Sequence, residues 1–432
     1  MGCGSTYPAS NFYRHSVFMD GRNPALVIRE AIARALVDYY PLAGRLRELE
    51  GRKLAVDCTG EGVLFVEADA DVRLEDFGGD ALCPPFPCVE ELLFDAPDSS
   101  ATLDSPLLHF QVTRLACGGF ILAIRTQHAL ADAQGLLQFL GAVAELARGA
   151  SSAPTVRPVW MRCELLQARN PPRPSFPHRE YDDVPLDEGT IVVGDDQLVE
   201  RSFFFAPQDI AAVRAQLEQP RLRERATAYE ILAGCLWKCR TAALAPPDEE
   251  IMRMISVVSA RGDKPTGLRV PEGYYGNAFA FATAVSGAGK LRANPVSHAV
   301  ELVRKAKAEV DAEYAQSVAD LMALRGRPLI TVAGAFVVSD VTKAGFRGVD
   351  FGWGPPVYGG VAASPFPGLI SFLVACTNAK GEHGVVVSMC LPGPAMDRFV
   401  EEIGKLLRPA AVDDDVAAPQ HPRVFPTKLS AL

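Results

Sequence analysis

Two histidine–aspartate pairs in this chain have a spacing that could support acid–base chemistry. His128 and Asp132 lie four residues apart in QHALADAQG, and His178 and Asp182 lie four residues apart in HREYD. A histidine that takes a proton from a substrate must be held in one tautomer and one orientation. Spacing alone does not distinguish the two pairs, so their surroundings in the chain must decide between them.

The surroundings favour His128. The preceding segment 119–127, GFILAIRTQ, is apolar and rich in β-branched residues, which is typical of a buried strand. Asp132 then opens a helical pattern of apolar residues, where free backbone N–H groups and the helix dipole stabilise a carboxylate. The sequence predicts that His128 is the catalytic base and that Asp132 is its structural anchor. The main alternative is a histidine packed in the core without a chemical role.

His178 lies in a different kind of segment. Residues 151–198 are rich in proline, arginine and acidic residues and show no sustained periodicity, which is typical of a linker. We expect His178 to be solvated there, with nothing that fixes its ring. It receives no chemical role.

Helices and strands alternate on both sides of this predicted linker. Asn23 followed by Pro24 predicts one helix start, and Thr227 with Glu230 forms the capping box of another. A long helix is expected from Asn294 to about Leu324. Because 432 residues exceed what one core usually serves, we predict an α/β protein with domains at 1–150 and 199–432, joined by a crossover linker at 151–198.

The composition excludes several classes of function. A net charge of −9 argues against nucleic-acid binding, and no apolar run approaches the length of a membrane-spanning helix. The ten cysteines form no C-x-x-C pairs, so we expect reduced thiols, no metal site and a cytoplasmic protein. The start MGCGST also fits an acylation pattern at Gly2 and Cys3, which leaves lipid anchoring as an alternative.

A second motif, DFGWG at 350–354, helps to interpret the H-x-x-x-D motif at 128–132. Together with H-x-x-x-D at 128–132, it resembles the two signatures of the plant BAHD acyltransferase family. The resemblance covers nearly the whole chain from about Phe12 and is closest to the alcohol-acylating branch, which includes benzyl alcohol O-benzoyltransferases. Supporting stretches are YYPLAGRL (39–46), SARG (259–262) and YYGN (274–277).

The resemblance implies a fold of two similar domains, each a mixed β-sheet with flanking helices as in chloramphenicol acetyltransferase. It implies acyl-CoA as co-substrate, for example benzoyl-CoA or acetyl-CoA, and a small alcohol as acceptor. No permanently bound cofactor and no metal are expected, and we expect a monomer. His128 would take the proton from the alcohol as its oxygen attacks the thioester carbonyl, without an acyl-enzyme.

The resemblance also assigns roles to other residues. Asp132 would turn away from the channel and form an orienting ion pair with Arg261. The loop near the CoA channel would be shaped by Asp350, Phe351, Gly352, Trp353 and Gly354. The acceptor pocket would include Asn11 and Tyr13, and the neighbourhood of CoA would include Arg261, Lys264, Tyr275 and Asn277.

One departure from the family concerns the start of the chain. Members of the family carry a further stretch before the FYR segment at 12–14, which supplies a first strand, whereas this chain begins with MGCGSTYPAS. We therefore expect the first domain to lack that strand and to leave a sheet edge unpaired.

Two alternative functions follow from these observations. One is a shortened, catalytically impaired homologue that still binds acyl-CoA. The other is a condensation domain of peptide synthetases, whose H-H-x-x-x-D-G motif differs here at Gln127 and Ala133.

Overall fold

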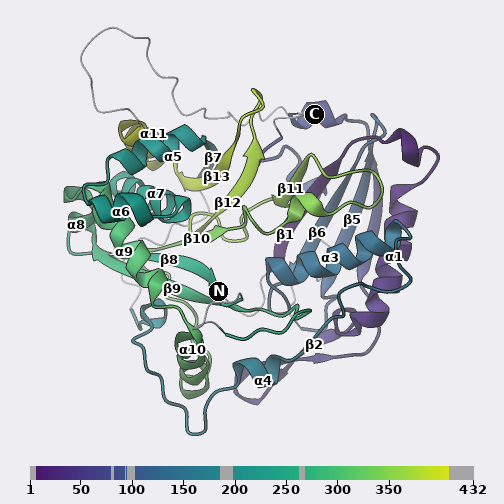
Figure 1. Ribbon diagram of the computed structural model, residues 1–432, viewed down its shortest axis with the longest axis horizontal. Helices are drawn as coiled ribbons and strands as arrows, with labels where there is room; N and C mark the ends of the chain where they lie inside the picture. The colour runs from purple at the N-terminus through teal and green to yellow at the C-terminus, as the bar shows by residue number, and fades with distance from the viewer. Residues whose placement is uncertain are drawn as a thin grey trace.

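Two β-sheets with helices packed against them lie side by side (Figure 1). The computed structural model describes residues 6–78, 82–92, 94, 103–184, 198–261 and 268–407 of the 432 in the chain. Gly2, Cys3 and Lys264 lie outside the described residues. Within the described residues, no helix has the length and apolar character needed to cross a membrane.

The first sheet has five strands in the order β11-β1-β6-β5-β4. These strands are β1 (Thr6–Tyr13), β4 (Leu64–Ala70), β5 (Leu108–Leu115), β6 (Phe120–Gln127) and β11 (Tyr358–Val361). Helices α1 (Pro24–Asp38) and α3 (Ala133–Ala147) pack on one face through a large apolar cluster. The strands β2 (Arg45–Leu49) and β3 (Lys53–Asp57) form a separate pair, and short helices lie at α2 (Val89–Leu92) and α4 (Arg162–Leu166).

The second sheet has six strands in the order β7-β13-β12-β10-β8-β9. These strands are β7 (Leu198–Phe205), β8 (Ile251–Ser259), β9 (Phe279–Gly287), β10 (Ala335–Asp340), β12 (Ile370–Thr377) and β13 (His383–Pro392). Its helices are α5 (Pro207–Ala215), α6 (Pro220–Arg225), α7 (Ala228–Leu244), α8 (Ala288–Ala293), α9 (Val296–Ala308), α10 (Ala312–Leu324) and α11 (Gly393–Leu407). Trp237 of α7 and Phe399 of α11 are fully buried in the core of this half.

The start of the described chain forms β1, an inner strand of the first sheet that ends with Phe12 and Tyr13 of the FYR segment, and the expected lack of a further strand before that segment stays a prediction. β1 pairs with β6 from Thr6 to Tyr13, and its other side pairs with β11. The edges of this sheet are β4 and β11, so the unpaired edge that we predicted beside this segment is not found among the described strands. The predicted domain ranges stay a prediction; β11, which pairs with β1, comes from the second half of the chain.

Local sequence signals set several helix ends. The Asn23 side chain accepts a hydrogen bond from the backbone N–H of Ala25 (2.9 Å) and so caps α1 as predicted. The predicted long helix from 294 to 324 is wrong, because it is divided into α9 and α10. The Asp311 side chain accepts a hydrogen bond from the backbone N–H of Tyr314 (2.8 Å), which starts a new helix within that range.

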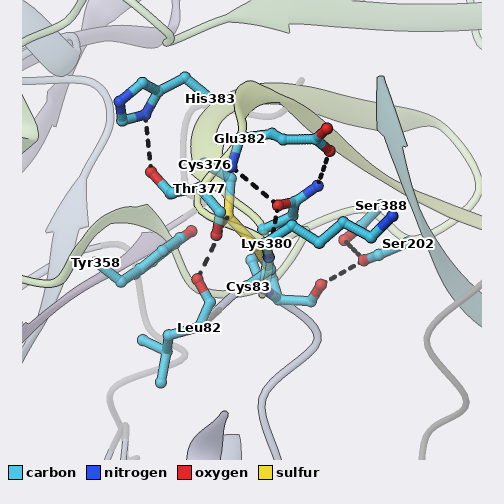
Figure 2. Close-up of a disulfide and its surroundings, with 12 residues drawn as sticks. Leu82, Cys83, Ser202, Tyr358, Cys376, Thr377, Lys380, Glu382, His383 and Ser388 are labelled. Carbon is cyan, nitrogen blue, oxygen red and sulfur yellow. Dashed lines mark hydrogen bonds between the residues drawn. A yellow bond between two sulfur atoms is a disulfide. The ribbon is translucent and has the colours of Figure 1, made fainter. Parts of the chain in front are cut away.

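A disulfide joins Cys83, in the segment before α2, to Cys376 on β12 (Figure 2). Our prediction of reduced cysteines is therefore wrong for this pair, whose members are 293 residues apart in the sequence. The Ser202 hydroxyl group on β7 donates to the carbonyl oxygen of Pro84, so the segment is also hydrogen-bonded to the second sheet. The other cysteines that the structure describes have free thiols.

Candidate functional site

A cavity of about 220 Å³ lies where the two sheets meet. Its walls come from the ends of β1 and β6, the first turn of α3, and strands β8, β9, β10 and β12 of the second sheet. Aromatic side chains in the lining are Tyr7, Phe279, Phe346 and Phe372, and charged or titratable ones also include His128, Asp132, Arg261, Asp340 and Lys343. The cavity therefore places one histidine among mainly apolar walls.

His128 directly follows β6 and is held from several sides. The centroid of its ring lies 4.3 Å from that of Tyr7 and 5.7 Å from that of Phe279. Its backbone carbonyl oxygen accepts a hydrogen bond from the Asn277 side chain (2.7 Å). Burial lowers the pKa of His128, while the charge of Asp132 and a hydrogen bond to its own backbone oppose this shift. The imidazole is therefore favoured in its neutral form, which can accept a proton.

Asp132 joins three parts of the protein. Its side chain caps α3 by accepting a hydrogen bond from the backbone N–H of Gly135 (3.0 Å), and it accepts a second from the N–H of Ala278 (3.0 Å). It also forms the predicted ion pair with Arg261, which follows β8 and donates to the carbonyl oxygen of Gly276. The carboxylate thus links the motif helix to the second half of the chain.

Arg162, in the predicted linker, is a supporting residue that the sequence analysis missed. Its guanidinium group donates to the carbonyl oxygen of Leu130, inside the H-x-x-x-D motif, and lies 3.3 Å from the ring centroid of Trp160. Burial lowers its pKa, with nearby Tyr274 and Tyr275 opposing the shift. An arginine in a charged, irregular segment gives no sequence signal for such a contact.

The DFGWG loop lies outside the cavity lining and folds back on itself. The Asp350 carboxylate accepts hydrogen bonds from the backbone N–H groups of Gly352 (2.7 Å) and Gly354 (2.8 Å). Both glycines have left-handed backbone angles, φ +112° and +90°, which other residues rarely adopt. Phe351 and Trp353 are buried in the core of the first sheet. The loop is therefore built as a structural unit, and its predicted role near CoA stays a prediction.

Asn11 and Tyr13 do not line the cavity, so their assignment to an acceptor pocket is corrected. Both are fully buried, and the Tyr13 hydroxyl group donates to the carbonyl oxygen of Val349 (2.9 Å). The reason is the direction of β1, which runs antiparallel to β6. Tyr7 lies beside the end of β6 that leads to His128, whereas Tyr13 lies six residues, or roughly 20 Å, further along the strand.

The predicted CoA neighbourhood is only partly at the cavity. Arg261 lines it, whereas Asn277 supports the backbone of His128. Tyr275 is 1% exposed and packs against Tyr39 at 5.0 Å between ring centroids, so it belongs to the core, and its place in the neighbourhood of CoA stays a prediction.

His178 is buried, which makes our expectation of a solvated ring wrong. One ring nitrogen lies 3.0 Å from the Glu180 carboxylate and the other 2.7 Å from the Ser317 hydroxyl oxygen. That oxygen also accepts hydrogen bonds from the backbone N–H groups of Ser175 and Phe176, so its own proton goes to His178. These residues resemble a serine–histidine–carboxylate triad, but they are buried and do not line the cavity. They attach the linker to α10.

Comparisons with known proteins agree with this arrangement. Residues 1–406 match the protein-family model described as the Transferase family. A benzyl alcohol O-benzoyltransferase from Petunia hybrida is 54% identical over 404 residues, which cover 93% of this chain and 86% of the relative.

Two solved structures share the fold. The structure of vinorine synthase has a TM-score of 0.66 at 19% identity and covers 94% of this chain and 91% of its own. TRI101 of F. sporotrichioides, solved with coenzyme A and T-2, has a TM-score of 0.65 at 16% identity and covers 92% of this chain and 93% of its own. The predicted two-domain α/β fold is confirmed.

Proposed function

The chain belongs to the Transferase family, the BAHD acyltransferases, and we propose that it transfers an acyl group from acyl-CoA to the hydroxyl group of a small alcohol. The observation that carries this proposal is His128, a half-buried imidazole that lines a mainly apolar cavity between the two sheets and whose pKa is lowered by desolvation. The relative from Petunia and the coenzyme A complex of TRI101 support the two substrates.

In the proposed mechanism His128 acts as a general base. Its neutral ring accepts the proton of the alcohol while the alcohol oxygen attacks the thioester carbonyl carbon, giving a tetrahedral intermediate. The carbon–sulfur bond then breaks, and the leaving CoA thiolate takes this proton from the imidazolium ring, which returns His128 to its neutral form. Base catalysis of this kind contributes roughly 10²–10⁴-fold to the rate. Asp132 does not touch the reacting atoms in this scheme; its charge stabilises the imidazolium while the proton is held.

The cavity supports an aromatic substrate group. Its volume of about 220 Å³ and its aromatic walls suit a benzene ring, since an apolar cavity of about 150 Å³ is known to bind benzene. We therefore propose benzoyl-CoA with benzyl alcohol as the first pair to assay, and acetyl-CoA as the second donor. Lys343, an exposed cation in the cavity lining, suits an anionic donor. That the protein is a cytoplasmic monomer stays a prediction from composition and resemblance.

The test is ester formation in a matrix of donors and alcohols, measured by mass spectrometry. Wild type should form ester with at least one pair, and His128→Ala should be slower by roughly 10²–10⁴-fold. His383→Ala, which removes an exposed histidine outside the cavity lining, should retain the wild-type rate.

Two outcomes would contradict the proposal. Equal rates for wild type and His128→Ala would remove the assignment of the base. Thermal stabilisation of wild type by acyl-CoA without any ester would favour the alternative of a non-catalytic binding protein; saturation at 100 times Kd corresponds to about 2.7 kcal/mol.

A further inference from the structure

Tyr7, near the start of β1, packs directly against the ring of the proposed base. The two ring planes are inclined at 56°, with centroids 4.3 Å apart. Phe279 of β9 meets the same imidazole edge-on at 85°. The imidazole is thus in contact with aromatic rings from both sheets, one from β1 and one from β9, and all three rings line the cavity.

The backbone around Tyr7 fixes the position of its side chain. Tyr7 pairs with Thr126 in the β1–β6 ladder, and His128 lies two residues further along the chain. In an antiparallel pair, such diagonal neighbours are within reach of aromatic side chains. The Tyr7 ring also meets Phe372 of β12 edge-on, with centroids 6.3 Å apart. Tyr7 is therefore packed against both His128 and the second sheet.

We propose that Tyr7 is a positioning residue, whose ring holds the imidazole of His128 in the orientation for proton transfer and keeps water from one of its sides. This inference rests on the proposed acyl transfer and adds a residue that belongs to neither motif. Tyr7 itself exchanges no proton in the scheme. Burial raises the pKa of its hydroxyl group, so the side chain stays neutral.

Removal of the ring should change how His128 titrates. Burial is the main cause of its lowered pKa, so water admitted beside the imidazole should raise that pKa towards the ordinary value of 6.5. The charge of Asp132 favours the protonated form and acts in the same direction. The charged groups that share the cavity with His128 are Asp132, Arg261, Asp340 and Lys343, and the substitution leaves all of them in place.

The experiment compares Tyr7→Phe and Tyr7→Ala with wild type, using kcat, KM and the pH profile of kcat/KM. Tyr7→Ala should lower kcat by about 10–100-fold with little change in KM, because the base loses its orientation. The acid limb of its pH profile should move to higher pH. Tyr7→Phe keeps the ring and should retain the wild-type profile. Tyr40→Ala, which removes an exposed tyrosine (60% exposed), should behave as wild type.

A second variant distinguishes a loss of activity at the site from a folding defect. Tyr7→Leu keeps an apolar side chain in the strand, and it should lose kcat at an unchanged melting temperature. The inference is overturned if Tyr7→Ala or Tyr7→Leu retains the wild-type kcat and pH profile. It is also overturned if Tyr7→Phe is as impaired as Tyr7→Ala, because the hydroxyl group would then be the active part.

The experiments distinguish a failure of the proposed acyl transfer from a failure of the proposed role of Tyr7. If wild type forms no ester with any pair of substrates, the proposed function fails. If wild type is active, His128→Ala is inactive and Tyr7→Ala is normal, the acyltransferase stands and only the role of Tyr7 is lost.

Discussion

Asp132 is a single side chain on which several contacts of the site depend. One oxygen caps α3, and the other accepts the backbone N–H of Ala278 and pairs with Arg261. The same charge favours the protonated form of His128, but burial has the larger effect and lowers the pKa of the ring. The proposed base therefore favours its neutral form at rest, and in the proposed mechanism the nearby carboxylate stabilises the cation that forms during the proton transfer.

Asp132→Asn should separate the capping role from the charge. Asparagine is as good a helix cap as aspartate, so α3 should still begin at the same place. The loss of the ion pair should cost about 1–3 kcal/mol of unfolding free energy, because the Arg261 side chain is largely buried and loses its charged partner, while it keeps the Gly276 carbonyl and the face of the Tyr274 ring. Urea unfolding of Asp132→Asn, Arg261→Gln and the double variant measures this coupling.

The double variant provides the internal control for this prediction. Its loss of stability should be smaller than the sum of the two single losses by at least about 0.5 kcal/mol, as expected for residues in contact. Strict additivity would show that the two side chains do not stabilise each other.

At the scale of elements, the position of α3 depends on a close backbone contact. A Cβ atom at Gly135, in the first turn, would lie only 2.0 Å from the carbonyl oxygen of Tyr275. One turn later, the Gln138 side chain donates to the carbonyl oxygen of Gly273 (2.7 Å). The segment 273–278 also supplies the contacts of Asn277 to His128 and of Ala278 to Asp132. Helix and segment together therefore fix both residues of the motif.

Gly135→Ala should force α3 away from this segment. Overpacking of this kind costs typically about 1–3 kcal/mol, and kcat should fall with it because His128 and Asp132 are displaced. Gly141→Ala lies in the same helix and meets no atom within 4 Å, so it should stabilise the helix by up to about 1 kcal/mol. Thermal unfolding and kcat of the two variants check the prediction. Equal effects at both positions would contradict the proposed contact.

At the scale of the whole molecule, contacts of several kinds join the two halves of the chain. β11 pairs with β1 across the halves, and the Asp132–Arg261 ion pair connects α3 to the loop after β8. The Cys83–Cys376 disulfide ties the segment before α2 to the second sheet (Figure 2). The buried cluster between the sheets includes Phe12 of the first sheet and Val374 of the second. The geometry of the cavity therefore depends on contacts between distant parts of the chain.

Reduction of the disulfide should lower the stability of the folded protein. Loss of a cross-link over such a long loop typically costs about 2–5 kcal/mol. A reductant should therefore lower the melting temperature of wild type but not of the Cys83→Ser/Cys376→Ser double variant. Cys88→Ser, which removes an exposed free thiol, should respond to the reductant as wild type does. A wild type whose disulfide is reduced without any change in melting temperature would contradict this prediction.

Local chemistry explains which parts of this structure could be predicted from the sequence. The caps at Asn23 and Asp132 depend on atoms within three residues, so sequence reasoning found both. His178 was misjudged because the hydroxyl group that fixes its ring, that of Ser317, is 139 residues away. The disulfide was missed for the same reason.

The resemblance to a family pointed to the proposed base and predicted the Asp132–Arg261 ion pair, but it did not predict the residues of the surrounding cavity walls. Tyr7 and Arg162 belong to no motif, and their contacts with the motif come from strand pairing and from the path of the linker. The direction of β1 decides that Tyr7 rather than Tyr13 meets the cavity. A strand direction within a sheet is a property of the fold that no local pattern contains.

The most direct test of the central claim is the pH dependence of kcat/KM for wild type and His128→Ala. The proposed base must be neutral to accept a proton, and burial lowers its pKa below the ordinary 6.5, so the neutral form predominates at neutral pH. Wild-type kcat/KM should therefore rise through one proton step below pH 6.5 and then level off, and His128→Ala should lack both this step and most of the rate. A wild-type profile without that step, or the same profile in His128→Ala, would contradict the account.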